Sequence, residues 1–253
     1  MNHLLIALIV FACVFGSALA GVALRAVLPQ HHLGDESVGV VKLATGLIAT
    51  LAALVLGLLI SSAKSSFDAV NNELIHNAAS IVQLDRVLAR YGPQTQQVRV
   101  LIKQSFGESI RILGSADAAQ LKRLGSLEAI RRTEDLQRRL TELAPQNDSQ
   151  RELRASAIQI ADQVLAVRWL ALLQAQGSIP IPLLVTLVLW LSVIFGAFGL
   201  FAPPNGTVVA ALFLGALSTS AAIFLILELN TPLDGIFTVS LVPMRDALAM
   251  LGQ

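Results

Sequence analysis

An apolar run at residues 43–60 constrains this chain more than any other feature of its sequence. The run contains no charged residue and no proline. A membrane crossing needs roughly 20 apolar residues at about 1.5 Å per residue, and a helix over about 40–61 has that length. The sequence then turns polar at Ser61 but stays compatible with a helix as far as Tyr91. It therefore predicts one helix that crosses a bilayer and continues into a soluble region.

The composition is typical of a membrane protein. Of the 253 residues, 55% are hydrophobic and 14% are charged, whereas about 25% of the residues of a soluble domain are charged. The charges gather in the middle, since 15 of the 18 Lys and Arg residues lie between Lys64 and Arg168. A net charge of +1 lacks the basic excess of a nucleic-acid-binding protein. We therefore expect apolar ends, a charged middle and no nucleic-acid partner.

Four apolar runs reach the length of a membrane span. We expect transmembrane helices at about residues 4–24, 40–61, 181–201 and 207–227. Pro180 and Pro182 suit the first turn of the third helix, where a missing N–H matters least. The link at 202–206 is short and rich in turn-forming residues. It predicts an antiparallel hairpin of the third and fourth helices.

These spans divide the chain into four parts. Residues 1–62 hold the first two spans and a short external loop, and residues 177–228 hold the last two. Residues 63–176 form a soluble domain, and residues 229–253 form a C-terminal segment. Glycine and proline positions in the soluble domain predict helices near 62–91, 94–113, 116–124, 126–143 and 148–176. The predicted fold class is all-α, with four transmembrane helices and a helical domain between spans two and three.

The first apolar run has an alternative interpretation as a cleaved signal peptide. Ala18 and Ala20 resemble a small-residue cleavage site. However, the run starts with only His3 where a signal peptide carries Lys or Arg, and it continues to Leu24. We therefore favour a retained span.

The basic residues near the spans predict the orientation. With four spans, both termini and the middle domain share one side, which carries Lys64, Arg168 and Arg245 next to the membrane. The opposite side has the uncharged turn 202–206 and a loop of mixed charge. The positive-inside rule therefore places the termini and the middle domain in the cytoplasm.

The sequence carries no sign of enzymatic chemistry. It has no P-loop, nucleophile elbow, zinc-protease motif or dinucleotide fingerprint, so we expect neither an enzyme nor a cofactor. His31, His32, Asp35 and Glu36 lie in the external loop, where ordinary loop polarity is favoured over a metal site. The single Cys13 lies in an apolar run and is interpreted as a small buried hydrophobic residue.

An arginine-rich stretch marks the middle domain. A solvated helix face held by i,i+4 ion pairs is favoured over a site for anionic lipid or nucleotide. Its charged residues are Glu128, Arg131, Arg132, Glu134, Asp135, Arg138 and Arg139.

The second span carries small residues at helical spacing. Gly46, Ala49, Ala53 and Gly57 fall on one face, which within one protomer favours close helix packing. The functional alternative is a narrow pore, and the two agree if several copies surround an axis. The candidate pore-lining residues are Lys42, Thr45, Gly46, Ala49, Thr50, Ala53, Leu56 and Gly57.

Glu228 ends the fourth span. A carboxylate at the C-terminus of a helix opposes the helix dipole. The position therefore predicts a partner, such as a cluster of backbone N–H groups, an arginine or a cation.

Two blocks of the sequence, residues 28–68 and 224–248, resemble the bacterial bestrophin-like domain family, which is distantly similar to the bestrophin channels. A turn follows the fourth span in bestrophins, with the pattern Glu-x-Asn-Pro-Phe-Gly. Here Leu233 takes the aromatic position and Thr231 is one extra residue. The corresponding residues are Glu228, Asn230, Pro232, Asp234 and Gly235.

The resemblance implies an oligomeric ion channel, a pentamer in bestrophins, lined by its second span and embedded in the bacterial plasma (inner) membrane. Ions and the lipid bilayer would be its partners. Two features differ from bestrophins: only Asp234 remains of the acidic calcium-binding run, and residues 43–60 contain no Phe. Calcium gating and ion selectivity are therefore not carried over. The alternative is a non-conducting membrane scaffold or signalling partner that uses its helical middle domain.

Overall fold

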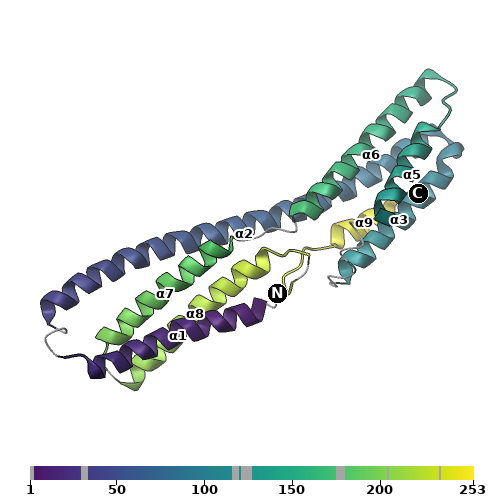
Figure 1. Cartoon of the computed structure of the whole chain (residues 1–253). Helices are drawn as coiled ribbons and strands as arrows, with labels where there is room; N and C mark the ends of the chain where they lie inside the picture. The colour runs from purple at the N-terminus through teal and green to yellow at the C-terminus, as the bar shows by residue number, and fades with distance from the viewer. Residues whose placement is uncertain are drawn as a thin grey trace. The chain divides into compact units, whose positions relative to one another are not determined.

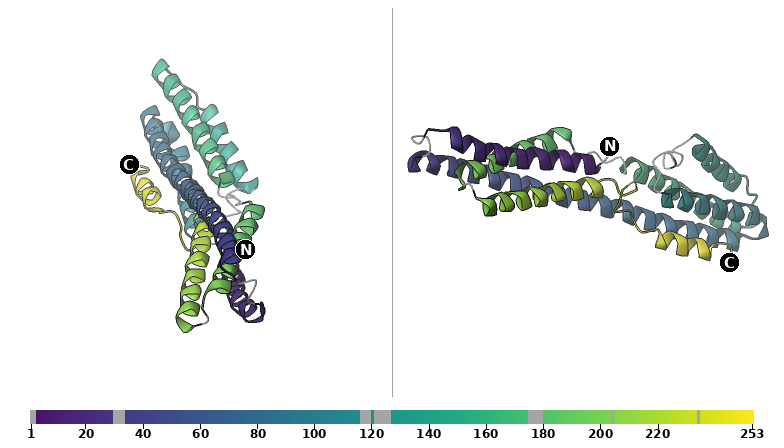
Figure 2. Two further views of the ribbon diagram at one scale, coloured as in Figure 1. Left: turned by 90° about the vertical axis from the view of Figure 1, so that its left-hand side faces the viewer. Right: turned by 90° about the horizontal axis from the view of Figure 1, so that it is seen from below.

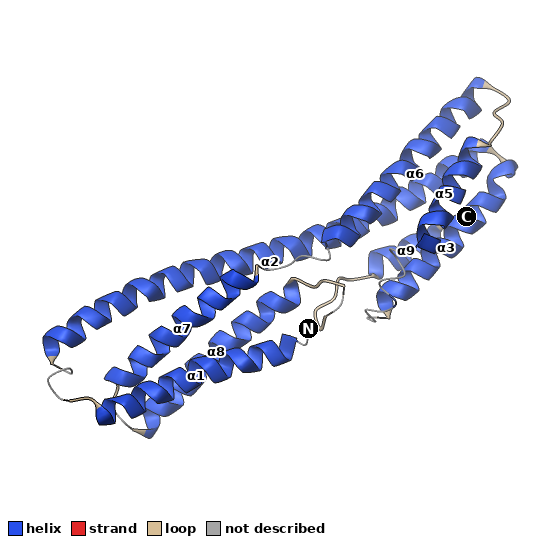
Figure 3. Ribbon diagram, viewed as in Figure 1, coloured by secondary structure: helices blue, strands red, loops and turns tan. Residues whose placement is uncertain are grey.

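The structure is a computed structural model that describes residues 3–29, 34–115, 120, 127–174, 180–203, 205–233 and 235–253. Every regular element within these residues is a helix (Figure 3). The elements are α1 (His3–Val27), α2 (Asp35–Tyr91), the 3₁₀ helix η2 (Pro93–Thr95), α3 (Gln96–Gly114), α5 (Leu127–Thr141), α6 (Asp148–Gln174), α7 (Ile181–Phe201), α8 (Gly206–Leu229) and α9 (Val242–Met250) (Figure 1). Helices α1, α2, α7 and α8 are long and apolar enough to cross a membrane. The all-α prediction with four long apolar helices is thus confirmed.

The chain forms two compact units. The apolar unit comprises Met1–Ser65 and Ser178–Asn230, and the polar unit comprises Ser66–Gly177 and Thr231–Gln253. Helix α2 belongs to both, because it continues without interruption from Asp35 to Tyr91. This confirms the prediction that the second apolar run continues as one helix into polar sequence. The expected helix at 116–124 lies outside the described residues.

Helix α1 is the centre of packing in the apolar unit. It contacts both α7 and α8 extensively, and the three helices run alongside one another in each view (Figure 2). Helices α7 and α8 run antiparallel, as the short link between them predicts, but they contact each other far less than either contacts α1. Arg25 at the end of α1 donates a 2.6 Å hydrogen bond to the carbonyl oxygen of Ala202 in that link.

Glycines bring the backbones of α1 and α7 together. A Cβ atom on Gly21 would lie 2.1 Å from the carbonyl oxygen of Gly196. A Cβ atom on Gly199 would lie 2.0 Å from the carbonyl oxygen of Ala18. Small residues permit such close approach between membrane helices, where van der Waals packing replaces the hydrophobic driving force. Cys13 on the same helix is exposed, so its interpretation as a buried residue is wrong; it faces away from the neighbouring helices.

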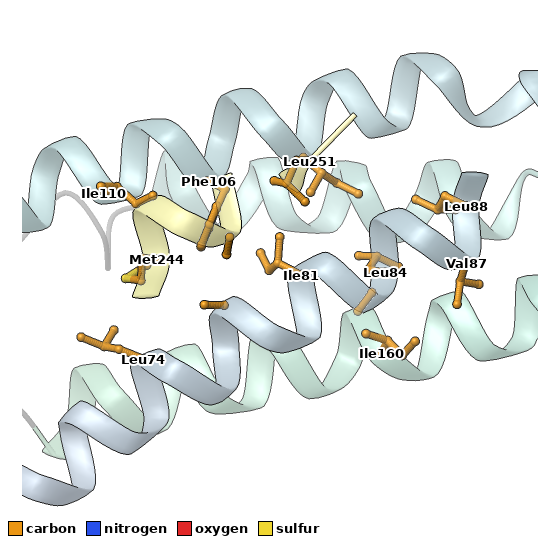
Figure 4. Close-up of a cluster of buried hydrophobic side chains, with 14 of the residues drawn as sticks. Leu74, Ile81, Leu84, Val87, Leu88, Phe106, Ile110, Ile160, Met244 and Leu251 are labelled. Carbon is orange, nitrogen blue, oxygen red and sulfur yellow. The ribbon is translucent and has the colours of Figure 1, made fainter. Parts of the chain in front are cut away.

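The polar unit has its own hydrophobic core between α2, α3, α6 and α9 (Figure 4). Its side chains recur every three or four residues along α2, which places them on one face of the helix. Fully burying one such side chain stabilises the fold by about 1.5–3 kcal/mol. The labelled members are Leu74, Ile81, Leu84, Val87, Leu88, Phe106, Ile110, Ile160, Met244 and Leu251.

Candidate functional site

The candidate pore residues of α2 share one side of the helix but differ in burial. Five of them lie within one narrow stripe, because an α-helix turns about 100° per residue, and all five are exposed in the chain. We call this stripe the outward face of α2: Lys42, Gly46, Thr50, Ala53 and Gly57. Thr45 is buried, and Ala49 and Leu56 are half-buried, so these three lie toward the other helices of the apolar unit.

The outward face is open and nearly free of side-chain bulk. A Cβ atom on Gly46 or Gly57 would have no heavy atom within 4 Å among the contacts that the structure describes. The hydroxyl of Thr50 donates a 2.9 Å hydrogen bond to the carbonyl oxygen of Gly46, one turn earlier. It is therefore satisfied by its own helix and needs no polar neighbour inside the chain.

Both ends of the outward face carry a cation, and its flank is apolar. Lys42 lies at one end, and Lys64 lies in the same stripe six turns later; both side chains are exposed. Between them the sequence holds no charged residue. Leu43, Leu54 and Leu58 flank the stripe and are 78%, 62% and 62% exposed. Such a flank is suited to lipid or to another protein chain.

A different side of α2 holds the helix in the apolar unit. Ala52, Leu59 and Ala63 are buried and pack in a core with residues of the other three apolar helices. The side of α2 directly opposite these residues carries Leu43 and Leu54, and the outward face lies beside that side.

Glu228, at the end of α8, lies beside a histidine, which is not among the partners that its position predicts. Its side chain is 5% exposed, and its Oε1 lies 3.0 Å from Nδ1 of His3. The pair joins the end of α8 to the start of α1, and a second bond reinforces this contact, since Ser220 Oγ donates to the carbonyl oxygen of Ala7 at 2.6 Å. The sequence analysis did not single out His3 for this role, because 225 residues separate the two side chains.

The turn after α8 starts with a helix cap and leads into a closed loop. The backbone N–H of Asn230 bonds back to the carbonyl oxygen of Ile226 at 3.2 Å, which ends the helix. Pro232 is buried and Gly235 is half-buried. Asp234, the remaining acidic residue of this turn, lies outside the described residues.

The family model of the bestrophin-like domain matches residues 10–244. The chain belongs to the bestrophin-like domain family. The match includes the outward face of α2, Glu228 and the turn that follows it, so the predicted family is confirmed. A bestrophin-like chain with four apolar helices of spanning length is a membrane protein that associates with the lipid bilayer. No curated protein and no solved structure matches the chain.

Two other regions of this bestrophin-like protein were candidate sites: the external loop and the arginine-rich stretch. The described residues contain no group of three His, Cys, Asp or Glu side chains arranged for a metal ion. His31 and His32 lie outside them, and the side chains of Asp35 and Glu36 are not described. In the arginine-rich stretch, Asp135 pairs with Arg139 at 2.7 Å, as the i,i+4 spacing predicts, and also with Arg138. The i,i+4 spacing also predicts pairs of Glu128 with Arg132 and of Glu134 with Arg138. The first lies outside the described side chains, and the structure places Arg138 beside Asp135 and Glu142.

A buried ion pair that sequence analysis missed lies in the polar unit. Asp85 on α2 is 1% exposed and receives two hydrogen bonds from Arg99 on α3, at 2.8 and 2.9 Å. The backbone N–H of Gly252 donates a third at 3.2 Å. Burial alone would raise the pKa of Asp85, but these bonds and the charges of Arg99 and Arg86 outweigh it and hold the pKa below its ordinary value.

The same cluster secures the end of the chain after α9. Lys103 donates to the carbonyl oxygen of Leu251 at 2.7 Å. Arg86 and Arg99 donate to that of Gln253 at 3.1 and 3.2 Å. We call Asp85, Arg86, Arg99 and Lys103, with residues 251–253, the C-terminal clasp. It fastens the end of α9 to α2 and α3.

Asp85→Asn is expected to destabilise the polar unit by about 3 kcal/mol at neutral pH, because it leaves the largely buried guanidinium of Arg99 without its carboxylate. The pKa of Asp85 is lower in the folded than in the unfolded chain. The pair therefore stabilises the fold above the unfolded pKa of about 3.9 and loses this effect as the pH falls through the folded pKa. Thermal unfolding and hydrogen exchange of residues 242–253, each measured between pH 3 and 7, test both statements.

The matched control is Asp135→Asn. Asp135 also accepts hydrogen bonds from arginine, but its partners Arg138 and Arg139 are exposed, and exposed ion pairs contribute little to stability. This variant should unfold at nearly the wild-type temperature. Equal effects of the two substitutions would contradict a special role for the clasp.

Proposed function

We propose that this bestrophin-like protein is an oligomeric ion channel in which α2 of each copy lines a central axis. The outward face of α2 is the observation that carries the proposal. It runs the length of the apolar segment, presents almost only backbone, Thr50 and Ala53, and is exposed within its own chain.

The small residues of the outward face suit it to line an axis. A helix surface of glycine and alanine leaves room at an axis when several copies converge, whereas leucines would fill it. The exposed leucines beside the stripe supply apolar surface for contacts between neighbouring copies. Lys42 and Lys64 would then form one ring of charge at each mouth of the pore, and rings of charged side chains act on ion passage.

The proposal also includes a subunit number, a membrane and an orientation. By family resemblance the assembly is a pentamer in the bacterial inner membrane, with both termini and the polar unit in the cytoplasm. By the same resemblance, the helices of the polar unit would form a vestibule of the channel. The buried contacts of α1 with α7 and α8 support its retention as a span rather than its removal as a signal peptide.

Reconstitution tests the proposal directly. The purified chain in liposomes is expected to pass small ions down an imposed gradient, and native mass measurement should give more than two subunits. Separate potassium and chloride gradients would identify the ion. An intact oligomer that passes neither ion would contradict conduction and favour a scaffold, while a monomer would contradict the shared axis.

A further inference from the structure

A closed loop follows the last apolar helix. The backbone N–H of Val239 donates to the carbonyl oxygen of Pro232 at 3.1 Å and closes the loop at its base. Leu233 and Val239, at 9% and 5% exposure, are part of the hydrophobic core of the polar unit. Packing thus fixes the base of the loop, whereas the tip lies outside this core.

The tip presents apolar side chains outward. Ile236 is 75% exposed and Phe237 is 48% exposed, and Val242 at the start of α9 is 56% exposed. Elsewhere in the described part of the polar unit, the large hydrophobic side chains that are exposed are Ile75, Val100 and Met250. Single exposed apolar residues are common, whereas a cluster marks a surface for a partner. Three of these six exposed side chains, Ile236, Phe237 and Val242, lie within seven residues of the sequence.

The charged residues nearest the tip in the sequence are Asp234 before it and Arg245 after it. Residues 235–244 read GIFTVSLVPM, with no Asp, Glu, Lys or Arg. A loop that faces water usually carries polar turn-forming residues. The segment between these two charges is neutral, and its exposed side chains Ile236, Phe237 and Val242 suit an apolar environment.

Covalent connection keeps the loop near the bilayer. Helix α8 ends at Leu229, and Pro232 follows after three residues, which span at most about 11 Å. The interfacial layer on each side of the hydrocarbon core is roughly 5–8 Å thick. The loop therefore starts within reach of the lipid headgroups, and its tip needs only a few residues to enter them.

We propose that Ile236 and Phe237 insert into the interfacial layer of the bilayer and anchor the start of α9 at the membrane surface. The partner is the boundary between lipid headgroups and acyl chains, where apolar side chains of peripheral segments bind. The inference needs the membrane spans but not ion conduction, so it stands or falls separately from the proposed channel.

Depth-dependent fluorescence quenching tests this anchor. Phe237→Trp is placed in a chain with Trp169→Phe and Trp190→Phe, and the protein is reconstituted in phosphatidylcholine brominated either near the headgroup or near the end of the acyl chain. We expect the new Trp to be quenched at least twice as strongly by the shallow bromines as by the deep ones.

The control is Val100→Trp in the same background. Val100 is 46% exposed, close to the value for Phe237. Its neighbour Arg99 pairs with Asp85 on α2. Asp85 follows Ile60 by 25 residues, which is about 37 Å along the helix. The Trp at position 100 should show no bromine quenching. Equal quenching at positions 237 and 100 would overturn the proposal. A blue-shifted but unquenched Trp at position 237 would also overturn it, because it indicates that a second copy of the chain covers the loop.

A second measurement guards against misfolding of the Trp-free background. Phe237→Cys in a Cys13→Ala chain carries a nitroxide label, and its accessibility to oxygen and to a water-soluble nickel complex is compared. An anchored tip gives greater access for oxygen than a label at position 100. Equal access at both positions would overturn the proposal.

Discussion

Gly199→Val is expected to lower the unfolding temperature of the apolar unit sharply. Even a Cβ atom at Gly199 would lie 2.0 Å from the carbonyl oxygen of Ala18 and 3.1 Å from the backbone nitrogen of Val22. These are backbone atoms of α1, so they cannot rotate away, and α1 must separate from α7. Overpacking typically costs about 1–3 kcal/mol, and we expect about 3 kcal/mol or more at this position.

Gly16→Val on α1 provides the matched control. A Cβ atom at Gly16 would meet nothing within 4 Å of the described contacts, so the same change in side chain should have little effect. Both variants are compared by thermal unfolding in detergent and by the amount of folded protein in the membrane. If Gly199→Val unfolds at the wild-type temperature, the close approach of α1 and α7 is not what holds the bundle together.

The contact between α1 and α7 separates the features of the fold that can be predicted from the sequence from those that cannot. Apolar runs, the prolines at 180 and 182, and the absence of a helix breaker between 61 and 91 are local signals, and they predict the four long helices and the continuity of α2. Which helix packs against which is not local. Every span is apolar on all sides, so hydrophobic periodicity does not reveal that α1 packs along both α7 and α8.

In the candidate site too, local sequence signals predict some features and tertiary packing determines the others. Spacing alone places Gly46, Ala53 and Gly57 on one side of α2, but only packing separates them from Thr45, which is buried. The partner of Glu228 and the pair of Asp85 with Arg99 depend on side chains brought together by tertiary contacts. A charge at a helix end indicates that a partner is needed, but it does not identify His3 at the other end of the chain.

Ala53→Phe is expected to reduce ion flux by at least about tenfold without changing the subunit count. Ala53 lies on the outward face and is exposed within its own chain. If α2 surrounds an axis, the substitution places a ring of phenyl groups at one level of the pore. Such a hydrophobic constriction closes a pore by bulk and by dewetting. Liposome flux and native mass measurement, taken on the same preparation, provide the two readings.

Ala221→Phe on α8 is the matched control, because Ala221 is also exposed on a spanning helix but lies outside the proposed axis. It should conduct at nearly the wild-type rate. Loss of flux in both variants would indicate general damage to the membrane bundle. Normal flux and normal assembly of Ala53→Phe would remove α2 from the axis. Normal folding with loss of the oligomer would instead make the outward face a contact between copies, since small residues serve close helix packing as readily as they line a pore.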